Sequence, residues 1–167
     1  MQLEEFFSYK NRLMKGICGD GKIARLITDD PDVRTPSHAL AYTQVFPYEY
    51  IPETVDEGKT FICFDVDIDR VENKTFYMPV LYVWCFTHKS KFRLPGGGVR
   101  LDQLSSELDR LLNGSRIYGL GELNLRSVTR FSPILDYQGR VLVYTAKDFN
   151  RSPGRVQAVP ANRRDGE

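Results

Sequence analysis

The stretch that decides the fold is FICFDVDIDRV, residues 61–71. Apolar side chains recur at every second position from 62 to 68. The positions between them include three aspartates: Asp65, Asp67 and Asp69. Because successive side chains of a strand point to opposite faces of a sheet, this period predicts a β-strand with one apolar and one acidic face.

Further strands are expected after a turn at residues 71–74. They cover residues 75–93, 121–131 and 140–149. Residues 80–86 are apolar on both faces and include Trp84, which is typical of a central strand covered on each side. The last two strands are joined by a predicted turn at Asp136-Tyr137-Gln138-Gly139, and the first two are expected to be antiparallel neighbours.

Three other stretches carry apolar residues at steps of three and four, which is the period of a helix. They are residues 3–17, 23–27 and 101–112. The last is a leucine stripe that stops at Asn113-Gly114, two residues that tolerate the left-handed backbone of a helix end. These elements predict an α+β fold with a small, mainly antiparallel sheet of about four strands and helices packed on one face.

We expect residues 1–150 to form one α+β domain. Within it, residues 30–60 have no clean period and several prolines, yet they are rich in aromatic side chains, which predicts a long irregular arm. The arm residues expected to contact a neighbouring subunit or partner are Tyr42, Phe46, Tyr48, Tyr50 and Ile51. Residues 151–167 are small, polar and arginine-containing, and we expect a disordered tail there.

Composition narrows the function classes. The 23 basic and 22 acidic residues nearly cancel, which argues against a nucleic-acid binder that works through bulk charge. The 3 cysteines lie far apart with no CxxC pair, so buried thiols are expected rather than disulfides or metal ligands. Acidic residues at positions 4 and 5, and no apolar run long enough to span a bilayer, lead us to expect neither export nor membrane insertion.

The most pointed chemical pattern is the acidic stripe, defined as Asp65, Asp67 and Asp69. Carboxylates two positions apart on one strand face are able to bridge a hard cation. The spacing resembles a calcium loop, but Arg70 stands where that loop needs glycine, and strand-forming residues separate the acids. A metal site and a solvated or pore-facing stripe both stay open at this stage.

Other catalytic patterns are weak. The two histidines, His38 and His88, have no metal-binding spacing. The glycines at 96–98 precede a helix, but no lysine follows to make a phosphate loop, so a tight strand-to-helix connection is expected. A metal-dependent nuclease core is hinted at by Asp136 and Lys147, although a threonine occupies the position of its second ligand.

The second half of the chain carries a family resemblance. Its motifs are VRLDQL (99–104), LLNG (111–114), GLGEL (119–123), YQGR (137–140) and VYTAKDFN (143–150). In this order they resemble the small neck proteins of tailed bacteriophages, and most narrowly the tail terminator, or tail-to-head joining, proteins. The order of helix, strand pair, helix and strand pair is similar to theirs, whereas the arm at residues 30–60 departs from the plainest members.

The resemblance implies a structural protein without catalytic residues, cofactor or metal. Such proteins form a ring, expected to be a homo-hexamer, that ends growth of the tail tube and joins the tail to the head. The implied partners are further copies of the chain, the tail tube protein and a head-completion or neck adaptor protein, with no membrane. The implied location is the virion or a tail-like particle, assembled in the cytoplasm of the bacterial host.

In such a ring DNA passes through the bore without being read. The acidic stripe is therefore expected to face the lumen, where it would repel the duplex. Another neck or head/tail-completion adaptor is the nearest alternative function. A small metal-dependent nuclease and a binding module of host origin are the alternatives from other classes.

Overall fold

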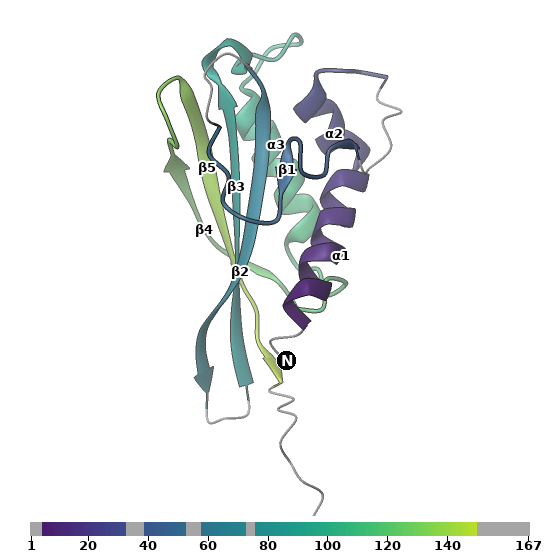
Figure 1. Ribbon diagram of the computed structural model, residues 1–167, viewed down its shortest axis with the longest axis vertical. Helices are drawn as coiled ribbons and strands as arrows, with labels where there is room; N and C mark the ends of the chain where they lie inside the picture. The colour runs from purple at the N-terminus through teal and green to yellow at the C-terminus, as the bar shows by residue number, and fades with distance from the viewer. Residues whose placement is uncertain (1–4, 33–38, 53–57, 73–75, 150–167) are drawn as a thin grey trace, which may run out of the picture.

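The computed structural model describes residues 5–32, 39–52, 58–72 and 76–149. In these ranges helices and an open, mostly antiparallel sheet form two layers, which confirms the predicted α+β class (Figure 1). The helices are α1 (Glu5–Gly19), α2 (Gly21–Thr28), the short 3-10 helix η3 (Lys89–Lys91) and α3 (Arg100–Leu112). The strands are β1 (Val45–Phe46), β2 (Thr60–Glu72), β3 (Phe76–His88), β4 (Asn124–Phe131), β5 (Tyr137–Thr145) and β6 (Asp148–Phe149).

The sheet has the strand order β1-β2-β3-β5-β4, and β6 pairs with the first two residues of β3, Phe76 and Tyr77. The four long strands are the four predicted ones, and all are antiparallel to their neighbours. The arm adds β1, which runs parallel to β2 at Ile62 and Cys63. β5 follows β4 in the chain but lies between β3 and β4, so the last long strand occupies the interior of the sheet.

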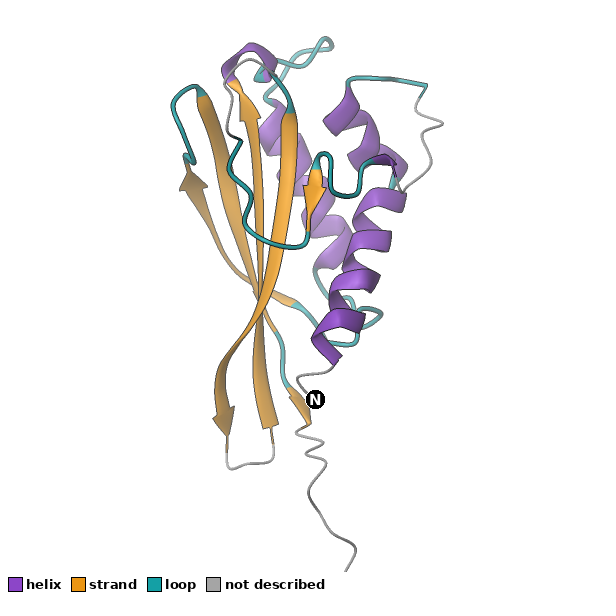
Figure 2. Cartoon of the chain, in the orientation of Figure 1, coloured by secondary structure: helices purple, strands orange, loops and turns teal. Residues whose placement is uncertain are grey.

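The helices cover one face of the sheet, here called the inner face (Figure 2). The main core lies between them and joins Leu13 and Ile17 of α1 and Leu104 and Leu108 of α3 to Phe64, Leu81 and Leu142 of the strands. The alternation that begins at residue 61 explains this, because its even-numbered apolar residues all face the helices. Each fully buried leucine or isoleucine contributes about 2 kcal/mol to this packing.

The turn predicted over residues 136–139 is wrong in its position. Asp136 takes the left-handed turn conformation, with φ 70°, but β5 already begins at Tyr137. Gly139 lies inside β5 and pairs with Phe86 of β3. Gly139 allows two strands to approach closely and is not part of a turn. A glycine in the sequence is typical of either situation, so the local sequence alone does not distinguish them.

The three cysteines are buried and free, as the sequence predicts. Burial raises the pKa of Cys18 and of Cys85 to about 11 and that of Cys63 to about 12. These thiols therefore act as small apolar core groups at neutral pH. The expected tail at 151–167 and His38 lie outside the described residues.

Candidate functional site

The face of the sheet that turns away from the helices, here called the outer face, is only partly covered. One half carries a second cluster of buried residues: Phe46, Phe61, Cys63, Phe86 and Tyr137. Beyond it, Tyr82 stacks on Trp84 with ring centroids 5.8 Å apart, and both side chains stay half-buried. Val141 and Val143 of β5 lie in the same face and are also half-buried. A single chain thus leaves large apolar side chains partly open to solvent.

The arm residues divide into two groups. Phe46 is 5% exposed and stacks on the half-buried Tyr50 with ring centroids 4.0 Å apart, so both pack on the chain's own sheet. Tyr42, Tyr48 and Ile51 are 62%, 45% and 48% exposed. Of the arm residues singled out in the sequence, these three present the most side-chain surface to a partner.

The acidic stripe lies on the outer face at the β2 side of the sheet. Asp65 and Asp67 pair with Tyr82 and Val80 of β3. Asp69 stands at a bulge between Ile68 and Arg70 and lines a shallow hollow of ≈ 370 Å³ together with Val80 and Arg126. Bulges redirect side chains along a strand, and this one keeps Asp69 on the face of the other two aspartates.

The stripe is not a uniform set of carboxylates. Asp65 forms an ion pair with Lys10 of α1, with 2.6 Å between Oδ1 and Nζ, and Lys10 also donates a hydrogen bond to the carbonyl of Pro47. Asp67 and Asp69 are exposed. Among the described residues, no three His, Cys, Asp or Glu side chains converge as a metal site would require.

The opposite edge of the sheet is basic, a feature that the sequence reasoning missed. β4 has no residue that is fully buried, and Arg126 and Arg130 are exposed on it. Near its end a groove of ≈ 580 Å³ runs past Val99, Arg130 and Phe131 toward the start of α3. The sequence could have predicted it, because Arg126 and Arg130 lie four positions apart in a predicted strand and therefore share one face of it.

The residues behind the nuclease alternative are not brought together. Asp136 precedes β5 and pairs with Lys89 at 2.8 Å, whereas Lys147 follows the end of the same strand. A strand of this length separates them by roughly 30 Å at the usual rise per residue. His88 accepts a hydrogen bond from the Ser90 backbone N–H at the start of η3, which is a local capping role.

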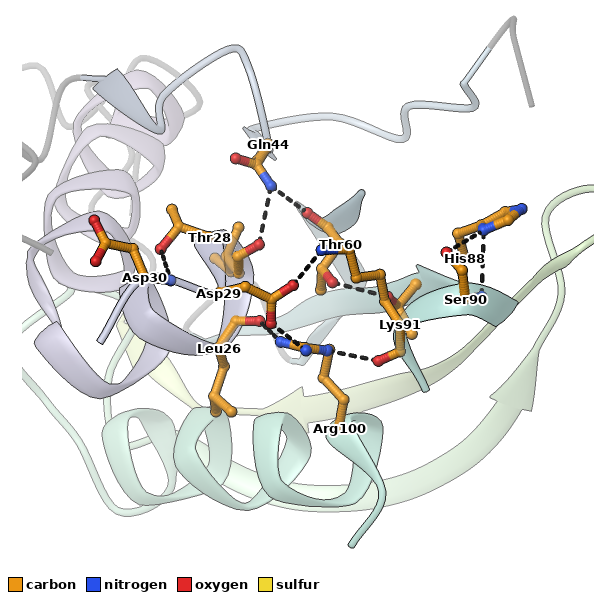
Figure 3. A network of polar contacts seen from close by, with 12 residues as sticks. Leu26, Thr28, Asp29, Asp30, Gln44, Thr60, His88, Ser90, Lys91 and Arg100 are labelled. Carbon is orange, nitrogen blue, oxygen red and sulfur yellow. Dashed lines mark hydrogen bonds and ion pairs between the residues drawn. The ribbon is translucent and has the colours of Figure 1, made fainter. Parts of the chain in front are cut away.

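A buried arginine ties the elements together at one end of the molecule (Figure 3). Arg100, the first residue of α3, is 2% exposed. Its guanidinium forms an ion pair with Asp29, donates from Nε to the Lys91 carbonyl at 2.7 Å and donates from Nη1 to the Leu26 carbonyl. The Leu26 carbonyl belongs to the last turn of α2, so a cation from α3 satisfies and neutralises the end of the neighbouring helix.

Asp29 has the left-handed backbone at the end of α2, with φ 60°, and also binds Lys91. Burial alone would raise the pKa of its carboxyl, but the hydrogen bond from Lys91 and the charge of Arg100 outweigh it and hold the pKa below its ordinary value. A carboxyl with a lowered pKa in the folded protein stabilises the fold above its unfolded pKa. That contribution is lost as the pH falls through the folded pKa.

Replacing Asp29 by asparagine should therefore destabilise the protein at pH 7 and matter less in acid. Asparagine tolerates the same left-handed backbone, so the change removes mainly the charge. Urea unfolding of the wild type and Asp29→Asn from pH 7 to pH 3 should show a difference in unfolding free energy that narrows below about pH 4. A difference independent of pH would contradict the role of the ionised carboxylate.

Comparison with known proteins places the chain in a family. The YomW family model matches residues 20–146, from the residue that caps α2 to the residue after β5. The chain belongs to the YomW family. YomW proteins are associated with Bacillus phages and prophages, so this YomW domain is that of a phage-related protein. No curated protein matches the sequence.

The YomW match contains the whole long-strand sheet, α2 and α3, and it therefore includes the outer face, both sheet edges and the Arg100 network. α1 lies outside it. None of the helices in the described ranges has the length and apolar character needed to cross a membrane.

Proposed function

We propose that this chain is a structural subunit of a phage or phage-tail-like particle, and specifically a tail terminator. Copies form a ring, most simply of six, that ends growth of the tail tube and joins the tail to the head or neck. The protein performs no reaction in this role, and it acts by fitting against copies of itself, the tube protein and an adaptor. Assembly takes place in the host cytoplasm, and the finished ring resides in the particle.

The observation that carries the proposal is the outer face of the sheet. Tyr82, Trp84 and the valines of β5 form an apolar surface that the chain's own helices leave uncovered, while Tyr42, Tyr48 and Ile51 of the arm are exposed. Contiguous apolar surface of this kind marks protein contacts, and aromatic side chains are enriched at their centres. Membership of a phage-associated family supports a particle component over a host binding module.

Deleting the gene from the phage or prophage that carries it tests the proposal. A tail terminator is the stop for tube polymerisation, so the deletion should give tubes of uncontrolled length and heads without tails. Electron microscopy of induced lysates measures both, and expression of the wild-type chain in trans should restore joined particles.

The same micrographs separate the alternatives. Tails of normal length beside unjoined heads would indicate the neck or completion adaptor instead. Normal joined tails would contradict both particle roles. An expression control with Gly139→Ala should fail to complement, because the added Cβ overlaps the backbone of β3 and is expected to prevent folding.

A further inference from the structure

The two edges of the sheet carry opposite charge, and over most of their length no described strand pairs with them, although Lys10 contacts Asp65 of β2 and Asn113 accepts from the Leu125 N–H of β4. β1 pairs with β2 only at Ile62 and Cys63, so no described strand covers β2 from residue 64 onward. That part of the edge bears the acidic stripe, whereas β4 bears Arg126 and Arg130 at the other edge. In the described part of the chain neither arginine, nor Asp67 or Asp69, takes part in an ion pair. Asp65 is neutralised by Lys10, and Asp69 lines the same hollow as Arg126 of its own chain, so Asp67 is the stripe residue left to attract a charge on a neighbouring copy.

The strand directions of the two edges also match. β4 is antiparallel to β5, β5 to β3, and β3 to β2. β4 and β2 consequently run in opposite directions within one chain. Two copies placed side by side with the same orientation meet as β4 against β2 in an antiparallel pair. Hydrogen bonds between antiparallel strands run perpendicular to the strands, whereas those between parallel strands are slanted.

The register places the opposite charges at one level. Following the pairing across the sheet, Asn124 is level with Asp67, through Thr145 and Val80. Ser127 is level with Asp65, through Val143 and Tyr82. Arg126 lies at the bulge of β4 between these two levels. A neighbouring copy set beside the first without a shift along the strands thus brings Arg126 of one against the aspartates of the other.

We propose that copies of this chain join head to tail through an antiparallel contact between β4 of one copy and residues 65–69 of β2 in the next, with Arg126 diagonally opposite Asp67, where the long arginine side chain can reach it. The inference rests on the proposed function, because it names the contact by which that ring would close. The contact is heterologous, using a different surface on each side, so it propagates until rotation closes it. It also extends the half-covered outer face from one copy to the next.

This contact gives the acidic stripe a role different from the lumen-facing one expected from the sequence. Carboxylates that line an open bore do not contact Arg126 of a neighbouring copy. Reversing the charge of one of them would therefore not be compensated by reversing the charge at position 126. Carboxylates in the edge contact attract Arg126 of the neighbour. The two roles therefore predict different outcomes when the charges are exchanged.

The test uses two single reversals, Arg126→Glu and Asp67→Arg, in the full chain. Each sets like charges against each other at every contact, so each should weaken self-association by about tenfold or more. An equimolar mixture should assemble like the wild type. In it, the glutamate introduced at position 126 of one variant meets the arginine introduced at position 67 of the other, and the unchanged Arg126 meets the unchanged Asp67.

Light scattering over a concentration series measures the mass of the assemblies. Lys15→Glu and Asp32→Arg are the matched controls, because they reverse exposed charges of residues that belong to no strand, one in α1 and one after α2. Both controls should associate like the wild type.

A cross-linking measurement gives a second readout that does not depend on the reversals. Asn124→Cys and Asp67→Cys, which the register places level with each other, are prepared separately and mixed under oxidising conditions. Facing residues of an antiparallel pair are close enough for a disulfide, so the mixture should yield a linked dimer that neither variant alone yields. Lys15→Cys mixed with either should yield none.

The outcomes separate this inference from the proposed function. A wild type that assembles while both reversals assemble equally well, or while the mixture is no better than its parts, overturns the edge contact and leaves the ring itself standing. A wild type that stays monomeric at every concentration, with no cross-linked dimer, overturns the contact and counts against the ring as well.

Discussion

Replacing Gly139 by alanine should prevent the chain from reaching its native fold in useful yield. A Cβ at this position would overlap the Cys85 carbonyl oxygen and would lie 2.6 Å from Cβ of Phe86. Both atoms belong to β3, which is held between β2 and β5 and has no room to withdraw. Because the clash is with the neighbouring strand itself, a change of rotamer cannot relieve it, and we expect a loss of about 4 kcal/mol or more.

Soluble yield and thermal unfolding measure this effect. The matched control is Gly96→Ala, since a Cβ there meets nothing within 4 Å and the backbone is not left-handed. That variant should fold like the wild type. If Gly139→Ala unfolds at the wild-type temperature, β3 and β5 cannot be as close as described, and the assignment of Gly139 to the strand interior would be wrong.

Replacing Arg100 by methionine should have the second largest effect, a loss of about 3 kcal/mol. Methionine fills a similar volume but donates no hydrogen bond, so the carbonyls of Leu26 and Lys91 lose their side-chain donor in a buried place. Asp29 keeps only Lys91 as a partner. The penalty comes from leaving these acceptors unsatisfied, and the lost volume contributes little.

Two further variants show that geometry matters as well as charge. Arg100→Lys keeps the positive charge but cannot reach three acceptors with a planar fork, so it should recover less than half of the lost stability. Arg93→Met, at an exposed arginine in the segment that precedes α3, should change the free energy of unfolding by no more than about 0.5 kcal/mol. Equal denaturation midpoints for Arg100→Met and the wild type would show that the hydrogen bonds and ion pair of Arg100 do not stabilise the fold.

The layers of the fold were predictable because local periods report burial. The alternation from residue 62 to 68 identifies the buried face of β2, and the leucine stripe identifies that of α3. Each pattern can be read from its own segment, independently of the rest of the chain. The turn at residues 136–139 was misplaced because aspartate and glycine mark turns and also occur where strands approach closely. Only the contact between Gly139 and Phe86 distinguishes the two uses.

The candidate site was less predictable, since its parts are assembled by tertiary structure. The three aspartates were found from their spacing, but the bulge at Asp69 and the ion pair of Asp65 with Lys10 depend on β3 and α1. Arg100 looks like an ordinary helix-start residue, because its acceptor at Leu26 lies 74 positions away. That Arg126 lies between the levels of Asp67 and Asp65 follows only from the register of four strands.

The insertion of β5 between β3 and β4 has a consequence for how the chain is made. Synthesis runs from the N-terminus, so β4 is made before β5, the strand that it pairs with among the described strands. Until residues 137–145 follow, β3 keeps one long apolar edge without a partner and β4 has nothing to join. The complete sheet therefore forms only after β5 has been synthesised, and a nascent chain arrested within β5 would carry an unpaired edge of β3, a form prone to aggregation.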